Sequence, residues 1–125
     1  MQLSLTTVVA TVLGAAGLAA ADSMTIFHQN CHRINGCDKS VATFHTAYGS
    51  YSINGNPGCY YDQRVPGQTE LCIDGAPNYR AHFYFSGQGR RCLVWDGNVV
   101  PGGDCGAQAT GHCYYHNYVE VGCSW

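Results

Sequence analysis

The chain has 125 residues, of which 46% are hydrophobic and only 11% are charged, and its formal net charge is −2. Nucleic acid is not an expected partner, because binding a polyanion needs several clustered cations and only Arg90 and Arg91 are adjacent here. The low basic charge also argues against membrane lysis, which usually relies on a cationic amphipathic surface.

The N-terminal segment, residues 1–21, has the features of a secretory signal peptide. Its apolar run, residues 8–18, is shorter than the helix of about 20 residues that crosses a bilayer. Three alanines, residues 19–21, precede Asp22 and offer the small side chains that a signal peptidase requires. We expect cleavage after Ala21, no membrane anchor, and release of residues 22–125 as a single extracellular domain.

Eight cysteines follow this leader, and we expect all of them to form disulfides. A domain of about 100 residues buries only about 60–70% of its unfolded surface, and each disulfide would add about 2–4 kcal/mol of stability. An oxidised thiol cannot ligate a metal, so export argues against zinc, and we expect no metal and no other cofactor. On the order of a hundred pairings are open. The cysteines are Cys31, Cys37, Cys59, Cys72, Cys92, Cys105, Cys113 and Cys123.

Short segments rich in aromatic and β-branched residues recur along the chain and predict strands. One segment, residues 39–48, permits two predictions. Its apolar residues have helical spacing, with Gly49 able to end a helix, but Val-Ala-Thr-Phe within it also suits a strand. The predicted strands cover residues 24–28, 48–53, 58–61, 69–73, 79–85, 91–95 and 113–121.

Asn-Gly and Asp-Gly pairs, each preceded by a large apolar residue, punctuate the chain. They tolerate the positive φ angles of tight hairpin turns. The pairs are Asn35-Gly36, Asn54-Gly55, Asp74-Gly75 and Asp96-Gly97. No low-complexity linker divides the chain, so we predict one all-β domain with room for one short helix. The expected architecture is a small disulfide-rich antiparallel β-sandwich or barrel.

Alternation along two predicted strands suggests one catalytic hypothesis. It places Arg80 and His82 on the outward face of one strand, and His116 and Glu120 together on a face of the C-terminal strand that we expect to be outward. A ribonuclease needs a base, an acid and a cation for the phosphate, which these residues could supply. Solvated polar residues are the simpler interpretation, and the His, Glu, Arg, His order of fungal guanyl-specific ribonucleases does not map onto the chain. We therefore expect no enzyme activity.

Tyrosine and tryptophan are abundant enough to suggest carbohydrate binding, because their faces stack on sugar rings. Most should fill the core of a domain poor in Leu and Ile. A surplus on the outside could form sugar-binding platforms or a homodimer face. The candidates are Tyr48, Tyr51, Tyr60, Tyr61, Tyr114, Tyr115, Trp95 and Trp125.

An alanine-rich leader, a mature domain near a hundred residues, eight cysteines and no catalytic signature together resemble the small secreted cysteine-rich proteins of filamentous fungi. Many of those proteins act on plant hosts as effectors or elicitors. The resemblance implies a non-enzymatic protein that binds a host protein or a cell-wall glycan and modulates plant defence. It is compositional and assigns no functional residues. An antimicrobial or killer-type toxin is the second hypothesis, and a small secreted ribonuclease is the third.

Overall fold

The computed structural model describes residues 21–32, 36–62, 64–103 and 112–125, and these form eight strands in one antiparallel sheet. The strands are β1 (Ser23–His32), β2 (Gly36–Thr46), β3 (Gly49–Asn54), β4 (Gly58–Tyr60), β5 (Gln68–Asp74), β6 (Arg80–Phe85), β7 (Arg91–Pro101) and β8 (His112–Val121). Within these ranges no residue is helical. The all-β prediction is confirmed. The described part of the chain contains no helix that is long and apolar enough to span a membrane.

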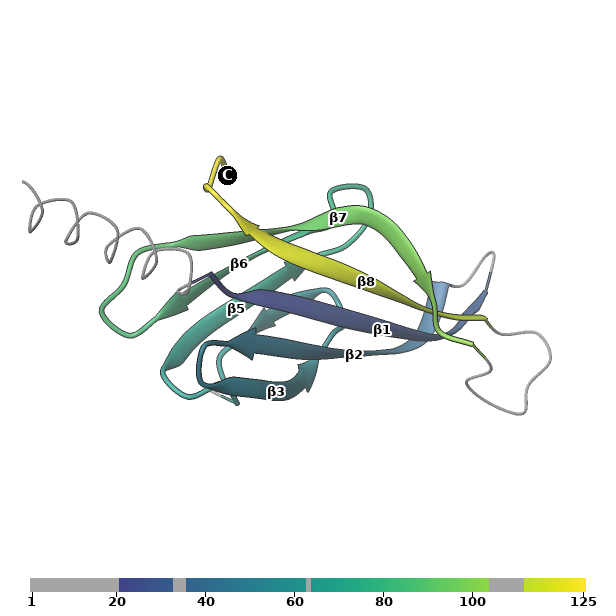
Figure 1. Ribbon diagram of the computed structural model, residues 1–125, viewed down its shortest axis with the longest axis horizontal. Helices are drawn as coiled ribbons and strands as arrows, with labels where there is room; N and C mark the ends of the chain where they lie inside the picture. Colours follow the sequence, from purple (N-terminus) through teal and green to yellow (C-terminus); the bar gives the residue numbers. More distant parts are fainter. Residues whose placement is uncertain (1–20, 33–35, 63, 104–111) are drawn as a thin grey trace, which may run out of the picture.

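The sheet curls because its two edges are joined by a very short connection. Its strand order is β3-β2-β1-β8-β7-β6-β5-β4, so the chain starts in the middle, reaches one edge at β3, and restarts at the other edge with β4. Residues 55–57 span at most about 14 Å, whereas the edges of a flat sheet of this width would lie about 34 Å apart. The result is a half-barrel, with β5 and β6 behind β1 and β2 in Figure 1.

The concave face of the half-barrel holds the core. Phe44 on β2 and Phe83 on β6 are both fully buried, and their ring centroids lie 5.0 Å apart although three strands separate β2 from β6 in the sheet. Gly55 passes this core so closely that a Cβ there would lie 3.0 Å from Ile26 Cγ2. The buried apolar cluster comprises Met24, Ile26, Ala42, Phe44, Ile53, Val65, Leu71, Ile73, Ala81, Phe83, Leu93 and Tyr118.

In the segment with two predictions, residues 39–46 belong to strand β2 and residues 47–48 form the turn after it, so the helical alternative is wrong. Ala42 and Phe44 are fully buried while Val41 and Thr43 are half-buried, which is the period of a strand with one face against the core. The segment pairs with β1 on one side and β3 on the other. Only a few apolar residues in the segment have helical spacing. The hydrogen bonds and the burial that the sheet offers outweigh that weak helical preference.

Three of the Asn-Gly and Asp-Gly pairs do not form the tight hairpin turns that the sequence predicts. Asp74-Gly75 opens the longer β5–β6 connection, residues 75–79, and Gly75 has no positive φ. Asp96-Gly97 lies inside β7, where Gly97 has a φ of 88° and the pairing with β8 shifts register. The pair therefore makes a bulge within one long strand. Gly55 starts the connection between the sheet edges instead of a hairpin, and its N–H donates to the Ser40 carbonyl at 3.0 Å. Asn35 lies outside the described residues.

The prediction of which face of the C-terminal strand points outward is wrong. Tyr118 and His116 are only 2% and 4% exposed, whereas Val119 is 44% exposed. The side of β8 that carries His116 and Tyr118 thus faces the concave interior, and the side that carries Val119 faces outward. Alternation separates the two faces correctly but does not say which one is buried.

Three disulfides join described residues, and each links parts of the chain that the sheet brings together. Cys31–Cys37 and Cys59–Cys72 bridge directly opposed residues of β1 and β2 and of β4 and β5. Cys92–Cys123 ties β7 to the segment after β8. Cys113 is also disulfide-bonded, and Cys105 lies outside the described residues.

Candidate functional site

The four ribonuclease candidates do not meet at one site. Arg80 and His82 lie on the convex face of β6, whereas His116 and Glu120 point to the concave side of β8. The His82 Nε2 atom lies 3.3 Å from a carboxylate oxygen of Glu70, and Arg80 donates to an aspartate on the neighbouring strand. A base, an acid and a phosphate-binding cation therefore do not converge from these four residues.

A shallow outer pocket of about 420 Å³ surrounds the two convex-face candidates. The Arg80 guanidinium lies 5.0 Å from the ring centroid of Trp125, and Arg90 donates to the Trp125 carbonyl at 2.8 Å. Glu70, Cys72 and His82 place potential metal-binding atoms within 4.8 Å of one another. Because the Cys72 sulfur is already in a disulfide, this group retains only two ligands and does not resemble a zinc site.

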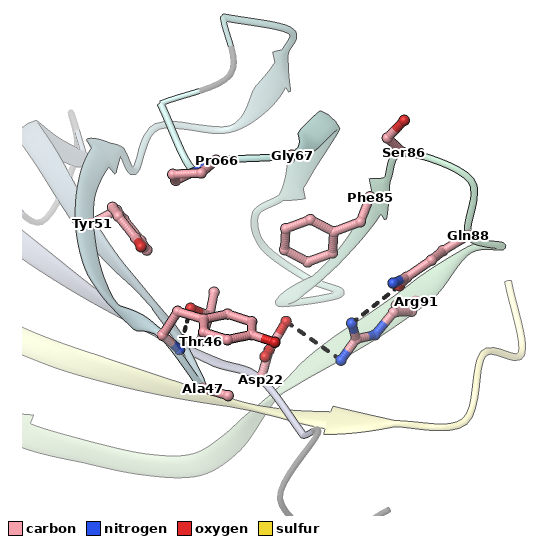
Figure 2. A pocket seen from close by; sticks show the side chains of 11 residues that line it. Asp22, Thr46, Ala47, Tyr51, Pro66, Gly67, Phe85, Ser86, Gln88 and Arg91 are labelled. Atoms are coloured by element: carbon pink, nitrogen blue, oxygen red, sulfur yellow. Dashed lines mark hydrogen bonds and ion pairs between the residues drawn. The ribbon is translucent and has the colours of Figure 1, made fainter.

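A second pocket, here called the rim pocket, opens at one end of the half-barrel and has a volume of about 430 Å³. Figure 2 shows Tyr51 and Phe85 on opposite sides of it, with Asp22 and Arg91 lying close to one another beside Phe85. Tyr48, at the tip of the β2–β3 hairpin, is 95% exposed. The pocket is lined by Asp22, Thr46, Ala47, Tyr48, Tyr51, Pro66, Gly67, Phe85, Ser86, Gln88 and Arg91.

Three charged side chains form an ion cluster, and two of them, Asp22 and Arg91, line the rim pocket. Arg91 on β7 binds both carboxylate oxygens of Glu120 on β8, at 2.8 and 2.7 Å, and its Nη2 lies 3.4 Å from Asp22 Oδ2. The backbone N–H of Asp22 donates to Glu120 Oε1 at 2.7 Å. The guanidinium also lies over the Phe83 and Phe85 rings, at 5.0 and 5.7 Å from their centroids.

The pKa values of the two acids in the cluster shift in opposite directions. Burial raises the pKa of Asp22, which Arg91 opposes only in part. Burial would raise the pKa of Glu120 as well, but hydrogen bonds from Arg91 and from the Asp22 N–H outweigh it and lower that pKa. Glu120 is therefore a structural carboxylate that is held ionised, and it is poorly suited to act as a general base.

A pair of histidines, His116 buried and His28 half-buried, lies further along the concave face. The rings of His28 on β1 and His116 on β8 lie 4.8 Å apart, and His28 Nδ1 lies 2.9 Å from the Ser40 hydroxyl. Neither His28 Nε2 nor His116 Nδ1 has a hydrogen-bond partner among the described residues. Burial, helped by His116, lowers the pKa of His28 to about 4. The rings of Trp95, Tyr79 and Tyr114 surround the pair.

The sequence analysis named Tyr48 and Tyr51 among many aromatics but missed the polar half of the rim pocket and the histidine pair. His28 could have been found, because it continues the alternation of the buried residues Met24 and Ile26 on β1. Arg91 carries no such signal, since its partners lie on β8 and at the start of the domain.

A search of protein-family models, curated proteins and solved structures found no match to this chain.

Proposed function

We propose that this protein is a secreted, non-enzymatic binding protein of the effector or elicitor kind, which modulates plant defence by binding a cell-wall glycan in the rim pocket. The observation that supports this most is the pocket itself. Its volume of about 430 Å³ falls in the range typical of small-molecule sites. Three disulfides suit an oxidising, extracellular environment.

The lining of the rim pocket favours a sugar over an apolar ligand. Tyr51 and Phe85 present ring faces on which the C–H groups of a pyranose can stack, and Tyr48 extends this aromatic surface beyond the opening. Thr46 and Gln88 add a hydroxyl and an amide that can exchange hydrogen bonds with sugar hydroxyls. Apolar faces with a few polar groups are the usual composition of a small-ligand site.

The ion cluster supports binding over hydrolysis at this site. A glycosidase needs two carboxyl groups that are free to serve as acid and as base or nucleophile. Both carboxylates of the ion cluster, that of Asp22 in the pocket lining and that of Glu120 behind it, instead contact Arg91. They shape and polarise the base of the pocket without offering a proton-transfer pair.

Glycan binding can be tested by titrating oxidised, ¹⁵N-labelled residues 22–125 with soluble oligosaccharides of chitin, β-glucan and xylan and following amide shifts by NMR. We expect shifts at the rim pocket and an affinity loss of about tenfold in Tyr51→Ala, since one aromatic stacking contact contributes about 0.5–1.5 kcal/mol. Tyr61→Ala is the matched control, because Tyr61 is 63% exposed and does not line the pocket. Equal affinities of the two variants would contradict the proposal.

The effector role needs a separate assay in plant tissue. Infiltration of the folded protein should cause a reactive-oxygen burst and defence-gene induction, and a reduced, alkylated sample of the same chain should not. Tyr51→Ala should weaken the response in proportion to its loss of glycan affinity. Growth inhibition of competing microbes without a plant response would favour the toxin hypothesis instead.

A ribonuclease is a second candidate, supported by one observation on the convex face. His82 lies 3.3 Å from Glu70 at the outer pocket, with Arg80 on the same strand. Glu70 and His82 would then be the base and the acid, in place of Glu120 and His116. RNA cleavage that is abolished by both His82→Ala and Glu70→Gln would support this candidate, and the absence of cleavage by the wild-type protein would exclude it.

A further inference from the structure

The rim ion cluster, formed by Asp22, Arg91 and Glu120, meets the chain at the residue that should become its N-terminus. Asp22 directly follows the expected cleavage site, and its backbone N–H already donates to Glu120 Oε1 at 2.7 Å. Its side chain is only 6% exposed. The first atom of the mature chain therefore lies within hydrogen-bond distance of a carboxylate in a sheltered site.

The charges of the rim ion cluster do not balance while Asp22 N is an amide. Among the described side chains of the cluster, two carboxylates face one guanidinium, which leaves one negative charge in excess. Burial raises the pKa of Asp22, the charge of Glu120 raises it further, and the guanidinium of Arg91 opposes both only in part. A further cation beside Glu120 and Asp22 would neutralise the cluster.

We propose that removal of the leader after Ala21 supplies this cation, because it converts the Asp22 amide into an α-ammonium group that binds Glu120 and completes the base of the rim pocket. In the cleavage step a signal peptidase adds one water across the Ala21–Asp22 peptide bond. Ala21 leaves as a carboxylate, and the nitrogen of Asp22 gains both hydrogens of the water as –NH₃⁺. The charge-assisted hydrogen bond that results is stronger than that of the neutral amide.

The geometry also distinguishes Asp22 from the neighbouring start positions. Cleavage after Ala20 would place the ammonium on the preceding residue, Ala21, about 3.8 Å away. The Asp22 N–H would then remain an amide. Cleavage after Asp22 would remove a carboxylate from the cluster altogether. Only a chain that starts at Asp22 brings two anions and two cations together at this point.

The inference rests on the proposed secretion, and its test starts with the full chain expressed from its own leader in a fungal host. Mass spectrometry of the released protein should give an N-terminus at Asp22. Thermal unfolding should then show that Nα-acetylation, or extension by Ala21, lowers the melting temperature by about 4–8 °C. This difference should vanish in Glu120→Gln and persist in Glu70→Gln, a matched change on the convex face. An N-terminus elsewhere, or a difference that survives Glu120→Gln, would overturn the inference.

If Glu120→Gln does not fold, titration of the free α-amine by NMR keeps the inference testable. The ordinary pKa of an α-amino group is about 7.7–8.0, and pairing with Glu120 must raise it. A value within or below that range would overturn the inference. Oligosaccharide titrations of the free and acetylated forms separate the two proposals. Failure of both forms to bind oligosaccharides would contradict the glycan proposal and leave the ammonium inference untouched.

Discussion

Mild acid should destabilise this protein through His28, and the size of the effect follows from its burial. The pKa of His28 is lowered to about 4 in the folded state, mainly by burial and further by His116, whereas a histidine in the unfolded chain titrates near 6.5. Between these values the unfolded chain binds more protons than the folded one. Stability is therefore fully present above pH 6.5 and is lost as the pH falls towards 4.

The linkage relation gives a loss of about 2 kcal/mol in the free energy of unfolding by pH 5, and about 3 kcal/mol by pH 4. Burial also lowers the pKa of His116, so the wild-type protein should lose somewhat more than His28 alone would cause. The raised pKa of Asp22 acts in the opposite direction, because the folded state then binds the extra proton. A comparison of variants at the same two pH values cancels this contribution.

Urea unfolding followed by tryptophan fluorescence at pH 7 and pH 5 measures the effect. His28→Gln keeps a polar group near Ser40. In this variant the free energy of unfolding should fall by about 2 kcal/mol less between pH 7 and pH 5 than it does in the wild-type protein. His45→Gln is the matched control, since His45 lies on the convex face and bonds Ser50 at an exposed position. If His28→Gln loses as much stability as the wild-type protein between pH 7 and 5, the argument from burial is refuted.

Two further predictions can be checked by the same urea assay at pH 7. Arg91→Leu should cost about 3 kcal/mol, because it leaves two sheltered carboxylates without the guanidinium that contacts both of them. Arg64→Leu should change stability by less than about 1 kcal/mol, since its ion pair is solvent-exposed. Equal costs would contradict the importance of the ion cluster. Phe44→Ala should cost about 3–5 kcal/mol, because the ring is fully buried against the opposite side of the half-barrel. Val119→Ala, a change at a residue 44% exposed, should cost far less.

Local sequence patterns predicted most of the strands because they report local conformational preference. Segments such as residues 79–85 are rich in aromatic side chains and alternate clearly, and Ala81 and Phe83 are buried as that alternation predicts. The failures are of another kind. Gly97 of the Asp96-Gly97 pair does adopt a positive φ angle, but in a bulge instead of a hairpin. The partner strand, and not the dipeptide, determines where a strand ends.

The candidate site was less predictable than the fold because its members come from distant parts of the chain. The rim ion cluster joins Asp22 to Glu120, which are separated by 98 positions. Arg91 looked like half of a dibasic pair, and nothing near it in sequence indicates that its guanidinium turns towards the concave face. The sequence predicts that Glu120 faces outward. It faces the interior instead, because the end of β8 pairs with the start of β1 and the side of β8 that carries Glu120 lies against the core.

The sequence by itself determined that this is a cysteine-rich all-β domain, because strand propensity, turn residues and cysteine content are properties of short segments or of the composition. The tertiary structure alone decided the cysteine pairing, the buried face of β8 and the rim pocket. Those features depend on strand register and on the curl of the sheet. Alternation has a period of two and does not say which face is inside, and the curl follows from a short link between edges whose order no local pattern encodes.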